Sequence, residues 1–157
     1  MRLTKYALLI AAASMFSACA TDTATGNEEE QQVPGANTNS LVVGLTSFDL
    51  ETGLSSGGAS TASDDFFILH IDVPTTAVRT LRAATLIRKW GPVSGLAELV
   101  GTVLPPTGWS SDAVGAEIVV NISDGFWIET DTGTVYAIYV KHIEKSVIFT
   151  FDWAVVG

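Results

Sequence analysis

The chain has 157 residues, of which 47% are hydrophobic and 16% charged, so it can build one compact domain and is too apolar to be wholly disordered. It carries 8 lysines and arginines against 17 aspartates and glutamates. This formal charge of −9 argues against nucleic acid as a partner, because such binding rests on cationic side chains. The single cysteine excludes an intramolecular disulfide and a zinc site built from several thiolates.

The first 18 residues have the layout of a secretory signal peptide. Arg2 and Lys5 precede an apolar run, Tyr6 to Phe16, and small residues follow it. This run is shorter than the roughly 20 residues that a membrane-spanning helix needs. We therefore expect residues 1–18 to direct export and then to be removed.

The only cysteine, Cys19, comes directly after Ser17 and Ala18 at the end of the apolar run. This segment resembles the lipobox of bacterial lipoproteins, with Phe16 where that family usually has leucine. The resemblance implies that Cys19 becomes the first mature residue and carries acyl chains that anchor the protein to a membrane. It also implies the outer membrane, in a cell that has one, because Ala20 rather than aspartate follows the cysteine. The alternative is soluble export by cleavage after Ala20.

Residues 19–40 are predicted to be the lipidated cysteine followed by a flexible acidic tether. They contain one large aliphatic residue, Val33, and the acidic run Glu28 to Glu30, so they cannot form a core. The folded domain is therefore expected to occupy residues 41–157, which is a common size for a single domain.

Alternation of apolar and polar residues recurs along residues 41–157 and predicts β-strands. Thr75–Trp90 fits either strands or a helix, and strands are favoured because strands flank it on both sides. The other expected strands are Leu41–Leu50, Phe66–Val73, Leu96–Leu104, Glu117–Ile122, Phe126–Thr130, Thr134–Ile143 and Val147–Val156. Short strands separated by turn residues predict an all-β domain, an antiparallel β-sandwich of jelly-roll or immunoglobulin-like type.

Two tryptophans are candidate ligand-binding residues, because sugar rings stack on exposed aromatic side chains. Trp109 lies in an expected loop, where contacts with ligands are common. Alternation places Trp127 on the strand face opposite Phe126 and Ile128, where it could be exposed. We therefore retain a glycan-binding module as the alternative function. Trp153 is expected in the core.

Gly53 to Gly57 match the G-x-S-x-G pattern of the hydrolase nucleophile elbow, with Ser55 as the nominal nucleophile. That elbow requires a strand before the serine and a helix after it. Here a glycine- and serine-rich segment follows, so a loop between strands is the favoured interpretation. No catalytic residue is assigned, and the sequence predicts a protein that is not an enzyme and uses no cofactor.

Histidines and acids form two candidate metal sites. His70 with Asp72 and His142 with Glu144 could converge on zinc if their strands were neighbours. Calcium is the second candidate, with carboxylate ligands on Glu129, Asp131 and Asp124. Acids beside turns are usually only solvated, so the favoured interpretation assigns no metal.

Cations are concentrated in one stretch that contains Arg79, Arg82, Arg88 and Lys89. They form either a solvated face or a basic patch suited to anionic headgroups or polysaccharide. The whole sequence predicts a lipid-anchored cell-envelope protein with a structural or interaction role. Its expected partners are the membrane, envelope proteins and glycans.

Overall fold

The computed structural model describes residues 32–44, 46–57, 63–72, 75–110, 116–144 and 147–157. Within them the elements are β1 (Asn37–Val42), β2 (Thr46–Asp49), β3 (Leu54–Gly57), β4 (Phe66–Asp72), β5 (Thr75–Thr80), β6 (Leu86–Pro92), α1 (Leu96–Gly101), β7 (Glu117–Val120), β8 (Asp124–Glu129), β9 (Val135–Glu144) and β10 (Ile148–Val155). The signal segment and Cys19 lie outside the described residues.

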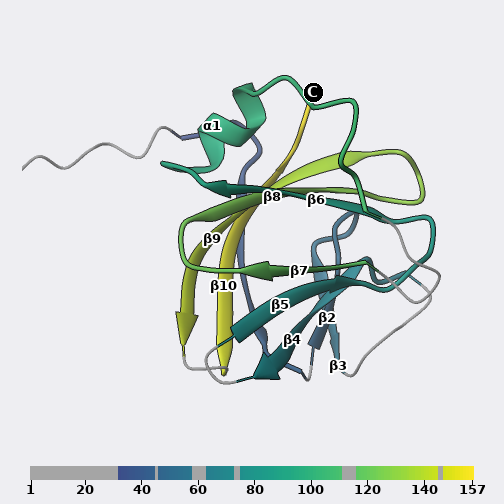
Figure 1. Ribbon diagram of the computed structural model, residues 1–157, viewed down its shortest axis with the longest axis vertical. Coiled ribbons are helices and arrows are strands. Elements are labelled where there is room, and N and C mark those ends of the chain that lie inside the picture. The colour runs from purple at the N-terminus through teal and green to yellow at the C-terminus, as the bar shows by residue number, and fades with distance from the viewer. Residues whose placement is uncertain (1–31, 45, 58–62, 73–74, 111–115, 145–146) are drawn as a thin grey trace, which may run out of the picture.

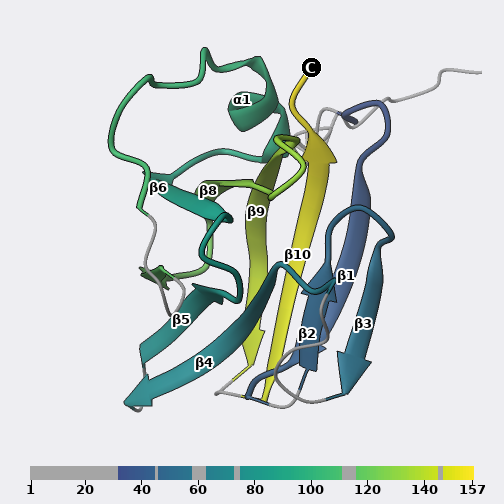
Figure 2. The same cartoon turned by 90° about the vertical axis from the view of Figure 1, so that its right-hand side faces the viewer.

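The strands form two five-stranded sheets that pack face to face, as Figures 1 and 2 show from two directions. Sheet A has the order β1-β10-β9-β8-β6, and sheet B has the order β3-β2-β4-β5-β7. Every strand pair is antiparallel. The predicted antiparallel β-sandwich is therefore confirmed.

Aromatic rings fill the core between the sheets. Phe48 packs against Phe66, Phe151 and Trp153, with ring centroids 5.7, 5.3 and 5.7 Å apart. Phe149 and Phe151 are fully buried and Trp153 packs against them, as the alternation of β10 predicts. Sequence periodicity thus identified β10 as a strand that contributes aromatic rings to the core.

The single strand expected at Leu41–Leu50 is two strands in different sheets. β1 pairs with β10, whereas β2 pairs with β3 and β4. Gly44 lies between them with a φ of +73°, a backbone conformation that favours glycine. The chain thus crosses here from sheet A to sheet B. Strand β1 also begins at Asn37, inside the segment predicted to be tether.

Thr75–Trp90 forms strands, as favoured, and these are β5 in sheet B and β6 in sheet A. The strand expected at Leu96–Leu104 is wrong, because this segment begins with helix α1. Glu98 accepts hydrogen bonds from the backbone nitrogen and the hydroxyl of Ser94, both at 2.9 Å, and these bonds lower the pKa of Glu98. They hold the first turn of the helix.

Helix α1 packs on the outer face of sheet A, against β8, β9 and β10. Leu96 and Leu99, one turn apart, are buried there with Trp127 and Ala137, and we name this group the outer cluster. A Cβ at Gly125 would lie 2.7 Å from both terminal carbons of Leu99. Glycine at this position therefore allows the helix to approach the sheet closely.

Candidate functional site

The two tryptophans predicted to bind glycans are not equally accessible. Trp127 faces outward from the sandwich, but its side chain is fully buried in the outer cluster. Its expected exposure is wrong, because α1 and the segment after it cover this face. Trp109 is half-buried and donates its indole hydrogen to the carbonyl of Pro105 at 3.0 Å. The exposed ring is Trp90, which is 47% exposed and lies edge-on to Trp127 at 5.3 Å.

Neither the elbow geometry nor the zinc geometry forms. Ser55 lies within strand β3, opposite Phe48, so it occupies a strand and not the predicted loop. His142 is exposed on β9 in sheet A, whereas His70 belongs to β4 in sheet B. The strand adjacency that zinc would require is therefore wrong. The side chains of His70 and Asp72 lie outside the described residues.

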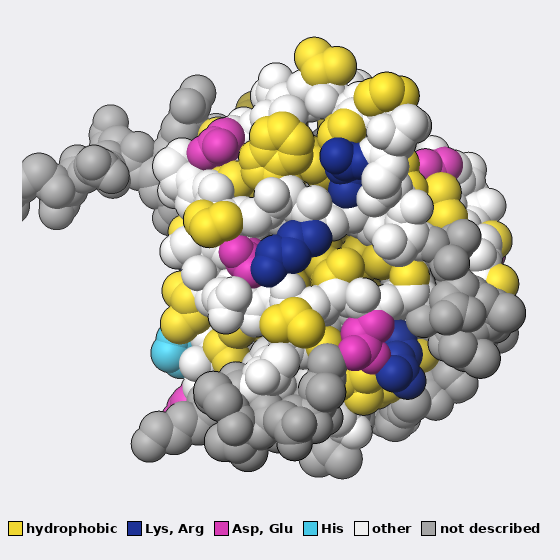
Figure 3. Space-filling model, in the orientation of Figure 1, with side chains coloured by type: hydrophobic (Ala, Val, Ile, Leu, Met, Phe, Trp, Pro, Cys, Tyr) yellow, Lys and Arg dark blue, Asp and Glu magenta, His cyan; other side chains and the backbone are white. Residues whose placement is uncertain are grey.

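The predicted basic patch is largely neutralised by ion pairs. Arg79 pairs with Glu117 and Lys89 pairs with Asp124, both at 2.6 Å. On the face drawn in Figure 3, dark blue and magenta side chains accordingly lie side by side. Within the described part of the chain, Arg88 is the patch member without an ion pair. A continuous cationic surface for anionic headgroups is therefore absent from the described residues.

The predicted calcium ligands do not converge. Asp124 and Asp131 lie at opposite ends of β8, about 20 Å apart along the strand. Asp124 is occupied by Lys89, and Asp131 by Arg82. The calcium site proposed on these acids and Glu129 is therefore wrong.

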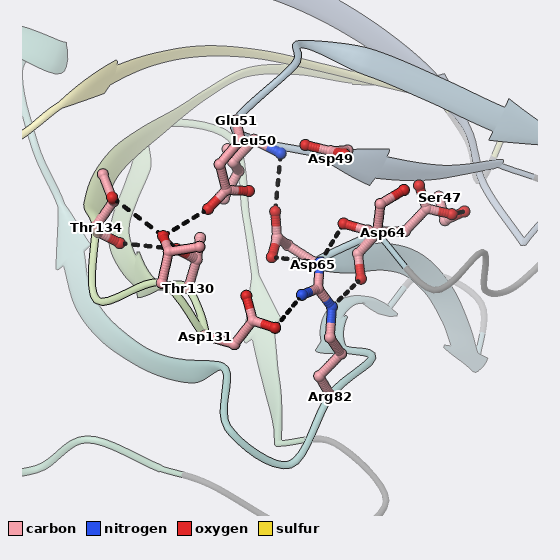
Figure 4. A network of polar contacts seen from close by, with 12 residues as sticks. Ser47, Asp49, Leu50, Glu51, Asp64, Asp65, Arg82, Thr130, Asp131 and Thr134 are labelled. Carbon is pink, nitrogen blue, oxygen red and sulfur yellow. Dashed lines mark hydrogen bonds and ion pairs between the residues drawn. The ribbon is translucent and has the colours of Figure 1, made fainter.

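Polar side chains gather instead at one end of the sandwich, where β2 ends and β4 begins (Figure 4). We name Asp49, Glu51 and Asp65 the acidic cluster. One carboxylate oxygen from each lies within 4.8 Å of the others. Asp65 is fully buried, and one of its oxygens accepts a 2.8 Å hydrogen bond from the backbone nitrogen of Leu50. Glu51 is exposed at the surface of the cluster.

Arg82 connects this cluster to the opposite sheet. Its guanidinium bonds to Asp131, in the turn between β8 and β9, and lies 3.4 Å from an oxygen of Asp65. It also donates to the backbone carbonyls of Ser63 and Asp64. Figure 4 shows the guanidinium pointing between these groups. The arginine therefore fastens sheet B to the β8–β9 turn of sheet A.

A second link between the sheets runs through the same turn. The hydroxyl of Thr132 donates to Glu51 at 3.1 Å and lies 2.8 Å from the hydroxyl of Thr130. The acidic cluster is thus held from both sheets by hydrogen bonds. The acidic cluster therefore joins the two sheets at this end of the sandwich.

Burial is the main cause of the pKa shifts in and beside the acidic cluster. The pKa of Asp65 is raised from 3.8 to about 7, mainly by burial and also by the nearby Glu51, while the Leu50 N–H and Arg82 oppose the shift. Burial, together with the charges of Glu51 and Asp65, also raises the pKa of Tyr136. The three carboxylates are close enough to share a cation. With a pKa of about 7, Asp65 also holds a proton over much of the neutral range.

The sequence alone does not predict this cluster. Its members come from two separate strand ends, at Asp49 with Glu51 and at Asp65, and only the pairing of β2 with β4 brings them together. The adjacent acids Asp64 and Asp65 at the start of an apolar strand were the available signal, because two carboxylates beside a buried strand need partners.

The similarities to known proteins are similarities of fold. No family model matches the sequence, and a search of curated proteins finds no match. A Bacteroides vulgatus protein, provisionally described as HmuY-like and heme-binding, has a TM-score of 0.56 at 12% identity, over 78% of this chain and 93% of that one. A Bacteroides fragilis protein, provisionally described as a lipoprotein, has a TM-score of 0.54 at 11% identity, over 75% and 88%. The likeness at these identities is one of fold. No helix in the described residues is long and apolar enough to cross a bilayer.

Proposed function

We propose that this chain is a lipoprotein of the cell envelope, anchored through Cys19, whose β-sandwich has a structural or interaction role and no catalytic activity. The observation that carries the proposal is Cys19, the single cysteine, placed at the end of a signal-peptide-like segment. An exported chain with one unpaired thiol needs an explanation, and acylation of that thiol supplies one.

The fold supports this assignment. The B. fragilis protein that is provisionally described as a lipoprotein has the same sandwich over 75% of this chain. Strand β1 begins at Asn37, so the segment between Cys19 and the first strand can span at most about 60 Å when fully extended. The anchored domain would therefore stay near the membrane surface, in the periplasm or on the cell exterior.

The positions of Ser55 and of the acidic cluster support the proposed lack of catalytic activity. Within the described residues, Ser55 lies in a strand and has no histidine as a hydrogen-bond partner. The acidic cluster lies within a network that joins the two sheets, which is a structural use of its carboxylates. Heme binding remains a description of the B. vulgatus protein, because at 12% identity the likeness extends to the fold alone.

Glycan binding is the second candidate function, and Trp90 favours it. Its ring is 47% exposed and rests against the buried Trp127, so it offers a fixed apolar surface on which a sugar ring could stack. Trp109 packs against the same outer cluster. Trp90 therefore replaces Trp127 as the candidate glycan-binding residue. Trp109, which packs against the outer cluster, remains a candidate beside it.

The Cys19→Ser variant is expected to leave the membrane fraction when the full chain is expressed in a bacterium that processes lipoproteins. Several acyl chains anchor a protein stably, because each buried methylene contributes about 0.8 kcal/mol, and serine offers no thiol to acylate. Fractionation followed by mass spectrometry of the N-terminus measures both effects.

The control is Ser17→Ala, which keeps a small residue before the cysteine and is expected to behave as the unaltered protein. An unmodified, soluble chain beginning at Thr21 in the unaltered protein would contradict the anchor and support cleavage after Ala20.

A further inference from the structure

Among the residues that the structure describes, Arg88 is a cation without a counter-charge. The other described cations, Arg79, Arg82, Lys89 and Lys141, each form an ion pair. Nitrogens Nε and Nη1 of Arg88 are buried and have no hydrogen-bond partner within the described ranges. Burying an ionised group without a partner is strongly unfavourable, so an acceptor at this position would stabilise the folded protein.

A second unpartnered donor lies beside it. Arg88 on β6 stands directly opposite Trp127 on β8, so their side chains share one face of sheet A, with Cβ atoms about 5 Å apart. The indole Nε1 of Trp127 is also buried and has no hydrogen-bond partner in the described part of the chain, and the residue is fully buried. Both side chains are donors only, and neither can satisfy the other.

The surroundings cover part of the Arg88 side chain and leave part of it exposed. Gly108, with a φ of +87°, places its backbone against the guanidinium, and a Cβ there would clash with Nη1. Arg88 as a whole is nevertheless only half-buried. In the upper part of Figure 3, where Figure 1 places α1 and β6, hydrophobic side chains gather on the surface. A ligand there would meet a cation set among apolar groups.

We propose that Arg88 and Trp127 form a binding site for a carboxylate group on the outer face of sheet A. The guanidinium supplies the positive charge and a planar set of donors that matches a carboxylate, and the indole supplies a neutral N–H donor. The site goes beyond the proposed envelope role and does not depend on the lipid anchor.

Charge favours a carboxylate over a phosphate. One guanidinium neutralises one negative charge, whereas a phosphate monoester carries about −1.5 to −2 at neutral pH. The chain already has a formal charge of −9, so the excess charge of a phosphate would be repelled. The exposed ring of Trp90, edge-on to Trp127, can contact the apolar body of the ligand.

The test uses the full exported chain in detergent, labelled with ¹⁵N and titrated with sodium glucuronate, a carboxylate on a sugar ring. We expect saturable shifts of the Trp127 Nε1–H and Arg88 Nε–H resonances. Glucose, the same kind of ring without the carboxylate, is expected to leave both resonances unmoved. Sodium chloride at equal ionic strength controls for screening.

Variants assign the site. Arg88→Met is expected to weaken glucuronate binding about tenfold or more, because charge-assisted hydrogen bonds are lost. Arg79→Met, which removes an arginine paired with Glu117, is the matched control and should leave binding unchanged. Trp127→Phe keeps an aromatic ring, removes the N–H donor and tests the site through the Arg88 resonance if Arg88→Met does not fold.

Three results would overturn the proposal. They are an absence of saturable shifts with glucuronate, equal shifts with glucose, and unchanged binding by both Arg88→Met and Trp127→Phe. Loss of membrane anchoring in Cys19→Ser would leave these measurements unaffected, so the two proposals can fail separately.

Discussion

Replacing Asp65 by asparagine is expected to stabilise the protein at pH 8 and to leave it nearly unchanged at pH 4. The carboxyl of Asp65 is fully buried, and its pKa is raised from 3.8 to about 7. Each unit of pKa difference between the folded and unfolded chain is worth about 1.4 kcal/mol. Ionised Asp65 therefore costs the folded state about 4 kcal/mol, and asparagine removes this cost.

The direction with pH follows from the raised pKa. Below about pH 3.8 Asp65 is protonated in both states, and its favourable contribution is fully present. That contribution declines as pH rises and is lost by about pH 7, where the folded state also ionises. The free energy of unfolding of the unaltered protein, minus that of Asp65→Asn, should fall by about 4 kcal/mol from pH 4 to pH 8.

Urea unfolding at a series of pH values measures this difference. The side-chain oxygen of asparagine can still accept from the Leu50 N–H, and its amide can donate to Glu51 as the protonated acid does. Glu144→Gln is the control, because Glu144 is an exposed acid at the end of β9 that is remote from the acidic cluster. A difference that stays constant from pH 4 to pH 8 for Asp65→Asn would show that folding does not raise the pKa of Asp65.

The Phe48→Ala variant is expected to lose about 4 kcal/mol of stability, which is typical for removing a buried aromatic ring. Phe48 is fully buried on β2, and its ring contacts Phe66 of its own sheet and Phe151 and Trp153 of the opposite sheet. Removing the ring would leave a cavity between the two sheets and would abolish these contacts. Because small domains are stable by about 5–15 kcal/mol, this loss would be a large fraction of the stability.

Chemical unfolding of the variant and of a matched exposed control measures this effect. Leu54→Ala on neighbouring β3 removes an apolar side chain that is 66% exposed, so it should change stability by less than about 0.5 kcal/mol. Phe48→Leu refills much of the cavity and should fall between the two. Equal losses for Phe48→Ala and Leu54→Ala would contradict the position of the core.

Alternation predicted the face of Trp127 correctly but not what covers it. It placed Trp127 on the outer face of sheet A, and the structure agrees. The ring is buried because Leu96 and Leu99 of α1 pack over it. Six residues with two leucines one turn apart are too few to show helical periodicity, so the sequence favoured a strand there.

Neither the acidic cluster nor the Arg88–Trp127 site could be predicted from the sequence, because each depends on which strands pair. The acidic cluster depends on β2 lying beside β4, and the opposition of Arg88 and Trp127 depends on β6 lying beside β8. Neither pairing joins consecutive strands, and local patterns contain no information about such contacts. The zinc hypothesis failed for the same reason, since it assumed that β4 and β9 were neighbours.

The place of β10 between β1 and β9 has a consequence for how the protein is made. Thr38 of β1 bonds to Asp152 of β10 at 2.5 Å, across 114 positions of sequence. Sheet A therefore cannot close until the chain has been synthesised through β10. Contacts this distant in sequence also slow folding to the range of milliseconds to seconds. Sheet A thus stays incomplete during synthesis, as the export that we propose would require.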